Sequence, residues 1–427
     1  MTLRYLTAGE SHGPELTAIL EGMPAGVAID RAAIDRELAR RQRGAGSSER
    51  MRIERDTARI TSGVLAGRTT GAPIAVVIEN RDHAAWADRD IPPMTVPRPG
   101  HADLAATVKY GYRDLRLGLE RASARETAAR VAVGALCKQL LAELGVTVGG
   151  YVVAIGDVEA DLPGVEADLF DVGADLPGGE DHTAQPQPSR RDVYARRIAA
   201  AEDSEVRCPD PAASAAMLEA IEAARRAKDT LGGVFEVVAL GVPPGLGSHV
   251  HDDRRLPGRL LAAVAGIPAV KGAEIGDAFD SARRRGSEVH DTFAAIDGRV
   301  VRRTNRGGGT EGGISTGEPL VVRAAMKPIS TTLRPMQSVD LATGEPADAR
   351  YERSDICAVP RAAVVGEAVV AFALAEALLE KLGGDSLAEI EPRLASLRSR
   401  RLDELEMDNR PWRFGYEPRR PADDPGA

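Results

Sequence analysis

Apolar positions with a helical spacing define the first predicted helix, in residues 30–44. Ile34 and Leu38 are four residues apart and would therefore lie on one face of such a helix. Asp30 stands at its start, where a carboxylate can accept a hydrogen bond from a first-turn N–H, and three arginines lie near its end. The pattern predicts a helix with one buried face.

Two further segments have the apolar content of core helices. Residues 123–145 begin with Ser123 and Glu126, which have the spacing of a capping box. Residues 363–382 are followed by two glycines, which favour a helix end. Between two glutamates this segment has only eight uncharged residues, far fewer than the roughly 20 that a membrane helix needs. We therefore expect a buried core helix there, and not a membrane span.

Short runs rich in β-branched and aliphatic residues, each bounded by glycine or proline, predict strands. They are residues 51–63, 73–80, 234–243 and 319–327. Helices and strands alternate only loosely, without the regular repeat of a doubly wound parallel sheet. The chain is therefore predicted to adopt a mixed α/β or α+β layered fold.

The composition of the 427 residues is that of a globular protein, with 43% hydrophobic and 28% charged residues. A net charge of −9 argues against binding to nucleic acid or to an anionic membrane. The three cysteines are far apart, so they indicate neither a disulfide framework nor a zinc cluster, and no metal site is expected. The first twenty residues lack the apolar region of a secretory signal, so we expect a cytoplasmic protein.

Two segments differ in composition from the rest of the chain. Residues 157–181 contain nine acidic residues and no lysine or arginine, which predicts a solvated surface insertion, with an acidic binding loop as the alternative. Residues 401–427 are rich in arginine, aspartate and proline and are expected to be a disordered tail. We expect no catalytic residue in either segment.

Two histidines stand in glycine-flanked turns, where the apolar patterns break. His12 lies in GESHG and His101 in RPGHAD, and both are candidates for proton transfer near neutral pH. A structural role is the alternative for each of them taken alone. His249 and His251, in SHVHDD, have no partner with metal-ligand spacing, so we expect a surface turn there.

The segment 305–319 contains Gly307, Gly309 and Gly312, which match the pattern G-x-G-x-x-G. A dinucleotide fingerprint should open a helix, whereas this segment leads into a predicted strand and lacks the ribose-binding acidic residue. The glycines instead favour a loop whose N–H groups approach a flat or anionic ligand. A merely flexible loop is the alternative.

Arginines cluster at several places although the chain is acidic overall, which suggests a small polyanionic substrate. Any single cluster can also be a solvated surface. The clusters are Arg40, Arg41 and Arg43; Arg98, Arg121 and Arg125; and Arg283, Arg284 and Arg285. At a helix start beside the second cluster, Ser123 would add N–H groups and a positive dipole end that suit a cofactor phosphate.

Two further charged residues stand next to apolar segments. Lys327 follows a predicted strand and precedes Ser330 and two threonines, which places several polar groups at a strand end. Asp355 lies between Arg353 and an apolar segment, where a carboxylate is either half of a structural salt bridge or a base.

Six motifs occur in the order found in the chorismate synthase family. They are GESHG, RPGHAD, RASARETAARVA, NRGGGTEGG, AAMKPIST and RSDICAVPR. The chain resembles that family over nearly its whole length, roughly residues 3–390. The resemblance implies one domain over residues 1–400 with an α+β fold, a β-α-β sandwich that has helices between antiparallel sheets.

The resemblance also implies an activity. Members of the family convert 5-enolpyruvylshikimate 3-phosphate to chorismate by a 1,4-anti elimination of phosphate and a ring hydrogen, the last common step of aromatic amino acid biosynthesis. The reaction needs reduced FMN but has no net redox change, and members are usually homotetramers. We therefore expect this small-molecule substrate, reduced FMN as the cofactor and a homotetramer.

The motif match assigns roles to individual residues. The two proton-donating histidines of the family correspond to His12 and His101; one is expected to protonate the departing phosphate and the other to assist at the flavin ring. The aspartate that helps the flavin N5 take up the substrate proton corresponds to Asp355. The residues expected to contact the flavin are Arg121, Ala122, Ser123, Pro268, Ala269, Gly312, Lys327, Pro328, Ile329, Ser330, Thr331 and Arg353.

The chain departs from the family in residues 44–47, which read GAGS where members usually have Gly-Tyr-Gly-Arg. Arg41 matches one family arginine assigned to nicotinamide or anion contact, but Ser47 replaces the other. This argues against direct NADPH binding, unless Arg43 or Arg50 compensates. No flavin-reductase segment is visible, so we expect an enzyme that takes reduced FMN from elsewhere.

Two other functions fit parts of the sequence. The G-x-G-x-x-G match would suit a flavin- or nicotinamide-dependent oxidoreductase, which would consume its cofactor stoichiometrically. The arginine clusters would suit an anion- or RNA-binding protein, against which the net charge argues.

Overall fold

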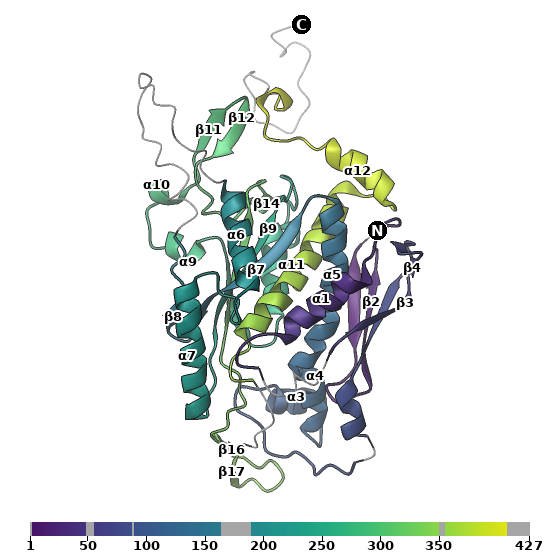
Figure 1. Ribbon diagram of the computed structural model, residues 1–427, viewed down its shortest axis with the longest axis vertical. Helices are drawn as coiled ribbons and strands as arrows, with labels where there is room; N and C mark the ends of the chain where they lie inside the picture. Colours follow the sequence, from purple (N-terminus) through teal and green to yellow (C-terminus); the bar gives the residue numbers. More distant parts are fainter. Residues whose placement is uncertain (1, 48–54, 88, 164–188, 350–354, 408–427) are drawn as a thin grey trace, which may run out of the picture.

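The computed structural model describes residues 2–47, 55–87, 89–163, 189–349 and 355–407. It contains two large antiparallel sheets with helices packed between them (Figure 1). This arrangement confirms the predicted α+β fold, a β-α-β sandwich.

The first sheet has four strands, in the order β1 (Arg4–Ala8), β2 (Glu15–Glu21), β6 (Ile74–Glu79) and β3 (Ala58–Ser62). In β2, Leu16, Ala18 and Leu20 are buried and alternate with more exposed residues, because successive side chains of a strand point to opposite faces. The turn between β1 and β2 carries His12 at one end of this sheet.

The second sheet has five strands, in the order β10 (Val270–Ile275), β15 (Leu320–Met326), β9 (Gly233–Leu240), β7 (Thr147–Ile155) and β8 (Val158–Glu159). Helices cover both of its faces. Phe235 and Val237 of β9 belong to the central core, whereas Val238 and Leu240 pack in a second cluster with Tyr194 of α6 (Arg190–Glu202). Burial on both faces explains why this strand is apolar throughout except at Glu236, whose carboxylate accepts hydrogen bonds from Tyr151 and Arg323.

Two long helices lie side by side between the sheets (Figure 1). α5 (Thr127–Glu143) packs against the first sheet and α11 (Val359–Leu382) against the second. A Cβ at Gly134 of α5 would lie 2.3 Å from Cβ of Ala368 on α11, so only glycine allows this approach. α1 (Arg31–Gln42) and α8 (Leu256–Ala265) also pack against α11.

Shorter elements surround this framework. The helices and 3₁₀ turns are η1 (Arg81–Ala85), α3 (Asp103–Tyr110), α4 (Arg116–Ala122), η2 (Ala124–Glu126), α7 (Pro211–Ala227), η3 (Asp252–Arg254), α9 (Ala278–Ser281), α10 (Gly286–Val289), α12 (Leu387–Ala395) and η4 (Leu402–Glu404). The strands are β4 (Val64–Leu65), β5 (Arg68–Thr69), β11 (Phe293–Ile296), β12 (Arg299–Arg302), β13 (Thr310–Glu311), β14 (Ile314–Ser315), β16 (Gln337–Val339) and β17 (Pro346–Asp348).

The predicted helices and strands are confirmed where the structure describes them, with one correction at a helix start; residues 51–54 of the first predicted strand lie outside the described residues. The capping box at Ser123 is wrong. The Ser123 hydroxyl accepts a hydrogen bond from the N–H of Arg125 and begins the 3₁₀ turn η2, so that α5 starts only at Thr127. The carboxylate of Glu126 is occupied elsewhere, because its Oε1 accepts a hydrogen bond from Oγ1 of Thr7 (2.7 Å).

α11 is long and apolar enough to cross a membrane by length and composition alone, but 89% of its most apolar stretch is buried inside the protein. It packs against α5, α8 and the second sheet. This confirms the prediction of a buried core helix.

The two compositionally distinct segments are described only in part. Residues 157–163 of the predicted insertion are described and include β8, and the rest of the insertion lies outside the described residues. Of the predicted tail, residues 401–407 are described: Arg401 forms a β-bridge with Arg299, and η4 follows. Residues 408–427 lie outside the described part.

Candidate active site

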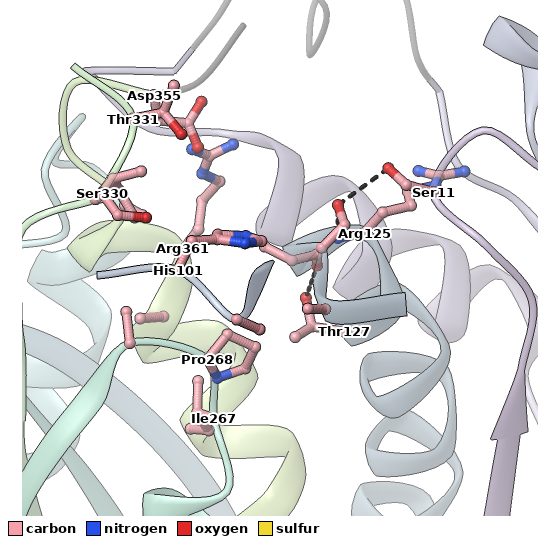
Figure 2. A pocket seen from close by; sticks show the side chains of 18 of the residues that line it. Ser11, His101, Arg125, Thr127, Ile267, Pro268, Ser330, Thr331, Asp355 and Arg361 are labelled. Atoms are coloured by element: carbon pink, nitrogen blue, oxygen red, sulfur yellow. Dashed lines mark hydrogen bonds and ion pairs between the residues drawn. The ribbon is translucent and has the colours of Figure 1, made fainter. Parts of the chain in front are cut away.

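A cavity of about 790 Å³ lies where the first turns of α5 and α11 meet. Its size falls within the range of about 300–1,000 Å³ that is typical of small-molecule sites. The other walls come from the β1–β2 turn, the end of α4 and residues within 82–86, 98–102, 266–269 and 326–331. Segments distant in sequence therefore share one cavity (Figure 2).

His12 lines this cavity and is held by three neighbouring groups. Its Nδ1 lies 2.7 Å from Oε1 of Glu120 on α4, and its backbone N–H donates to Oε2 of the same carboxylate (2.9 Å). The ring of Trp86 packs on the imidazole, with the ring centroids 4.0 Å apart. Asn80 donates hydrogen bonds to the carbonyls on either side of His12. These contacts fix both the turn and the imidazole.

His101 lines the same cavity from the turn before α3, which Gly100 makes possible with a φ of +76°. Its Nδ1 lies 2.5 Å from Oδ1 of the fully buried Asp103. The Arg98 guanidinium donates to both oxygens of that carboxylate (2.8 and 2.9 Å). Burial raises the pKa of Asp103, but the hydrogen bonds from Arg98 and His101 outweigh burial and hold this pKa well below its usual range. Nδ1 of His101 therefore contacts an ionised carboxylate, that of Asp103.

Two buried arginines form the wall at the start of α5. Arg41 reaches the cavity from α1, where its Nε donates to Oγ1 of Thr127 and its Nη2 to the carbonyl of Ala124, both at 2.9 Å. Arg125 binds both carboxylate oxygens of Asp56 (2.6 and 2.7 Å). Asp56 does not line the cavity, so the guanidinium groups stand between this carboxylate and the cavity.

Asp355 and Arg361 form an ion pair at the start of α11, and both line the cavity (Figure 2). Arg361 is one of the buried charged residues. Burial, and then the positive charge of Arg41, lowers the pKa of Arg361 to about 9, so the guanidinium is still charged at neutral pH. Asp355 is therefore half of a salt bridge that faces the cavity.

The opposite wall combines apolar surface with a few polar groups. Pro268 and Ala269 lie in the loop between α8 and β10, and Ala269 has a φ of +67°, a conformation that residues with a Cβ seldom adopt. Its carbonyl accepts a hydrogen bond from the N–H of Lys327 (3.0 Å). The Lys327 Nζ donates to the carbonyl of Gly100 (2.9 Å), which ties this wall to the His101 turn.

The cavity lining is positively charged although the whole chain carries a net charge of −9. Among the described residues that line it, five are arginine or lysine and two are aspartate. The five cations are Arg41, Arg98, Arg125, Lys327 and Arg361. Such a lining favours an anionic ligand.

Most of the residues that the motif match predicted belong to this lining. They are His12, His101, Asp355, Arg41, Ala122, Ser123, Pro268, Ala269, Lys327, Ile329, Ser330 and Thr331. Pro328 lies between lining residues without being one of them. Arg353 lies outside the described residues.

Two predicted flavin contacts are placed elsewhere in this chain. The guanidinium of Arg121 donates to the carbonyls of Thr7 and Gly9 (2.8 and 3.0 Å), next to the cavity and outside its lining. Gly312 forms the turn between β13 and β14 with a φ of +58° and does not line the cavity. Arg121 thus lies near His12, directly after Glu120, whereas Gly312 lies in the segment 305–319, none of which lines the cavity.

The glycine loop 305–319 was expected to present N–H groups to a ligand, but several of these groups form hydrogen bonds within the chain. Asp291 accepts hydrogen bonds from the N–H groups of Arg306 and Gly307, and Asn305 accepts one from Gly309. These N–H groups therefore bind within the chain, and residues 305–319, all of which are described, contribute nothing to the cavity lining. The segment continues into β13, with no helix after the glycines, which confirms that it is not a dinucleotide fingerprint.

Residues 44–47, where the chain departs from the family pattern, lie close to the cavity. The carbonyl of Gly46 accepts a hydrogen bond from the N–H of Ile356, the residue after Asp355. The Ser47 hydroxyl donates to the carbonyl of Gly44 and thereby closes a turn. Arg43 is exposed and does not line the cavity, and Arg50 lies outside the described residues.

The remaining sequence candidates are surface features. His251 contacts the carboxylates of Asp252 and Asp253, and all three side chains are exposed, as expected for a surface turn. Arg283, Arg284 and Arg285 are also exposed, so this cluster is a solvated surface.

Sequence reasoning missed four important side chains of the site: Asp103, Glu120, Trp86 and Arg361. The Asp103 carboxylate could have been identified, since it follows His101 by two residues in RPGHAD. Glu120 and Trp86 gave no such signal, because they reach His12 only through the packing of α4 and the segment after β6. Arg361 lies inside an apolar run, so in the sequence it looks like a single charged residue that interrupts a core helix.

The family model for chorismate synthase matches residues 3–379. The chain belongs to the chorismate synthase family. It is 53% identical over 398 residues to the chorismate synthase of Desulforudis audaxviator, covering 91% of this chain and 95% of that relative. It is 54% identical over 403 residues to that of Symbiobacterium thermophilum, covering 91% and 96%.

A solved structure described as a crystal structure of chorismate synthase has the same fold. It matches with a TM-score of 0.72 and 44% identity, covering 92% of this chain and 97% of that one. The chorismate synthase family thus accounts for the sandwich and for the order of the six motifs, and it makes this chain an enzyme by family membership.

Proposed function

We propose that this protein is a chorismate synthase, which converts 5-enolpyruvylshikimate 3-phosphate to chorismate and inorganic phosphate. The observation that carries this proposal is one cavity that holds both turn histidines together with five cationic side chains. A 1,4-elimination of phosphate needs proton transfer and stabilisation of the departing anion. Imidazole and guanidinium groups are suited to these two tasks.

The charges of the lining support a substrate with one phosphate and two carboxylates. Guanidinium groups bind both kinds of anion, often through two parallel hydrogen bonds. Asp56 and Asp103, which pair with Arg125 and Arg98, do not line the cavity. In each pair the arginine, and not the aspartate, is therefore available to a ligand.

The lining also fits reduced FMN as the cofactor. The apolar side chains of Ile267, Pro268 and Met326 offer a surface for a flat ring. Ser123 and Lys327 offer polar groups to its ribityl phosphate, or to the phosphate of the substrate. Reduced FMN supplies, when bound, the electron density that assists departure of the phosphate and is recovered at the end of the reaction.

The protein's own residues handle the protons in this proposal. His12 and His101 each contact a carboxylate through Nδ1, and one of them protonates the departing phosphate while the other assists at the flavin ring. Asp355, held by Arg361, helps to receive the proton that the substrate ring loses.

The source of reduced FMN is proposed to be external. Ser47 replaces a family arginine and its hydroxyl closes a local turn, so we do not propose direct NADPH binding. We further propose that the protein acts in the cytoplasm as a homotetramer, in aromatic amino acid biosynthesis, as its family membership suggests.

An anaerobic product assay tests the proposal. Purified protein is mixed with chemically reduced FMN and 5-enolpyruvylshikimate 3-phosphate, and chorismate absorbance and free phosphate are followed together. We expect both products in equal amounts, and neither of them with oxidised FMN. Folded protein that forms neither product under these conditions would rule the proposal out.

A further inference from the structure

Glu120 makes two contacts with one residue of the site. Its Oε1 lies 2.7 Å from Nδ1 of His12, and its Oε2 accepts the backbone N–H of His12 at 2.9 Å. Glu120 does not line the cavity, and its side chain is only 16% exposed. It therefore holds His12 from behind, while the imidazole faces the cavity.

The charge of Glu120 determines which ring nitrogen carries hydrogen in this contact. Burial raises the pKa of Glu120, but the two hydrogen bonds from His12 and the charge of Arg116 outweigh burial and lower this pKa below its usual value. An ionised carboxylate can only accept hydrogen bonds. Nδ1 of His12 must then be the donor, and Nε2 is the nitrogen at which the protonation state of the ring changes.

We propose that Glu120 is a positioning residue that fixes the tautomer and orientation of His12, so that Nε2 is the atom that exchanges a proton in the elimination. The inference rests on the proposed function, because it assumes that His12 transfers a proton. In Ser-His-Asp triads a buried carboxylate holds the histidine in the same way, and loss of the correct tautomer greatly slows catalysis.

The other groups around His12 limit how the ring can move without replacing the carboxylate. Trp86 covers one face of the ring and donates its Nε1–H to Asp82 (3.2 Å). Nδ1 of His83 lies 2.9 Å from the carbonyl oxygen of His12 and therefore engages the backbone. Among the contacts recorded for the described residues, the Glu120 carboxylate is the group that faces Nδ1.

Glu120→Gln tests the proposal directly, because the backbone N–H of His12 determines the orientation of the new side-chain amide. The N–H of His12 needs an acceptor, so the amide oxygen takes the place of Oε2. The amide NH₂ then faces Nδ1, which must become an acceptor. We therefore expect neutral His12 to carry hydrogen on Nδ1 in the unaltered protein and on Nε2 in E120Q.

The tautomer is read by ¹⁵N NMR of the full chain labelled at histidine, with the His12 signals assigned by their loss in His12→Gln. Turnover is measured in the anaerobic product assay, where we expect E120Q to lower kcat by about 10²-fold or more and to change KM little. Glu318→Gln is the control, because this part-buried carboxylate pairs with Arg190 and Arg400 and contacts no histidine. It should leave both the tautomer and kcat unchanged.

Each outcome decides a separate point. Hydrogen on Nε2 of neutral His12 in the unaltered protein overturns the inference, and so does an E120Q protein with unchanged tautomer and unchanged kcat. If E120Q fails to fold, Glu120→Asp keeps an acceptor and should keep the Nδ1–H tautomer; a change of tautomer there also overturns it. A missing activity in the unaltered protein speaks against the proposed function, whereas the NMR result still tests the contact.

Discussion

At the scale of single residues, the two histidines were predictable from sequence and their partners mostly were not. Both stand in glycine-flanked turns that break the apolar pattern, and such turns expose side chains. Asp103 could be found from its place in the same motif as His101. Glu120 could not, since 108 residues separate it from His12 and only the packing of α4 brings the two together.

His101→Ala tests the site at this scale. The variant keeps the Arg98–Asp103 ion pair, so the turn should fold and FMN binding should remain largely intact. Turnover should fall by about 10²-fold or more, which is the usual effect of losing a general acid or base. Flavin binding is measured by fluorescence quenching and turnover by chorismate formation.

His251→Ala serves as the matched control, because it removes an exposed histidine from a surface turn and should leave turnover unchanged. Near-normal turnover in His101→Ala would remove His101 from the mechanism.

At the scale of elements, helix and strand positions followed from the apolar pattern. The helix start at Asp30 was predicted correctly, since its side chain accepts a hydrogen bond from the N–H of Ala32, whereas the start near Ser123 depended on contacts that the pattern does not contain. The capping box at Ser123 failed because Glu126 binds Thr7 of β1 and not the helix start. The glycine loop likewise looked available for a ligand, but Asp291 and Asn305 accept hydrogen bonds from the N–H groups of three of its residues. Tertiary partners decided both cases.

Gly134→Ala tests the packing of the two central helices. The new Cβ would lie 2.3 Å from Cβ and 2.4 Å from Cα of Ala368, so α5 and α11 must move apart. Overpacking of this kind should lower the free energy of unfolding by about 2 kcal/mol, more than the helix propensity of alanine returns. Chemical denaturation measures the change.

Gly258→Ala in α8 is the matched control, since the nearest atom to its new Cβ is the Asp252 carbonyl oxygen at 3.9 Å. It should be neutral, or stabilising by up to about 1 kcal/mol. Equal effects of the two substitutions would contradict the close packing of α5 and α11.

At the scale of the whole molecule, a buried ion network connects elements that are far apart in sequence. Glu367 of α11 is fully buried and pairs with Arg40 of α1, Lys138 of α5 and Arg207. Sequence analysis placed Arg40 in a candidate substrate cluster, but the structure places it in this network, outside the cavity lining. Charge spacing alone could not separate it from Arg41, the next residue.

Glu367→Gln tests the network. Burial raises the pKa of Glu367, but Lys138, Arg40 and Arg207 outweigh burial and lower this pKa from 4.5 to about 2. The carboxylate therefore contributes its full stability above about pH 4.5 and loses it as the pH falls towards 2. At pH 7 the variant should be less stable by about 3 kcal/mol, because the buried Arg207 and the part-buried Arg40 and Lys138 lose a shared partner.

The free energies of unfolding of both proteins are compared by urea denaturation between pH 7 and pH 3. The difference between them should shrink as the pH falls below 4.5, since only the unaltered protein has this carboxylate to titrate. A difference that stays constant over this range would contradict the assignment. Arg401 and Asp403 form an exposed ion pair for comparison, and Asp403→Asn should change stability by less than about 1 kcal/mol.

A cavity that gathers two imidazoles and five cations should bring about the release of phosphate without consuming its reductant. Substoichiometric reduced FMN under strict exclusion of oxygen tests this directly, with a large excess of 5-enolpyruvylshikimate 3-phosphate. We predict many chorismate molecules per flavin, an equal amount of phosphate, and flavin that is still reduced at the end. One chorismate or fewer per flavin, with the flavin oxidised in step, would contradict it.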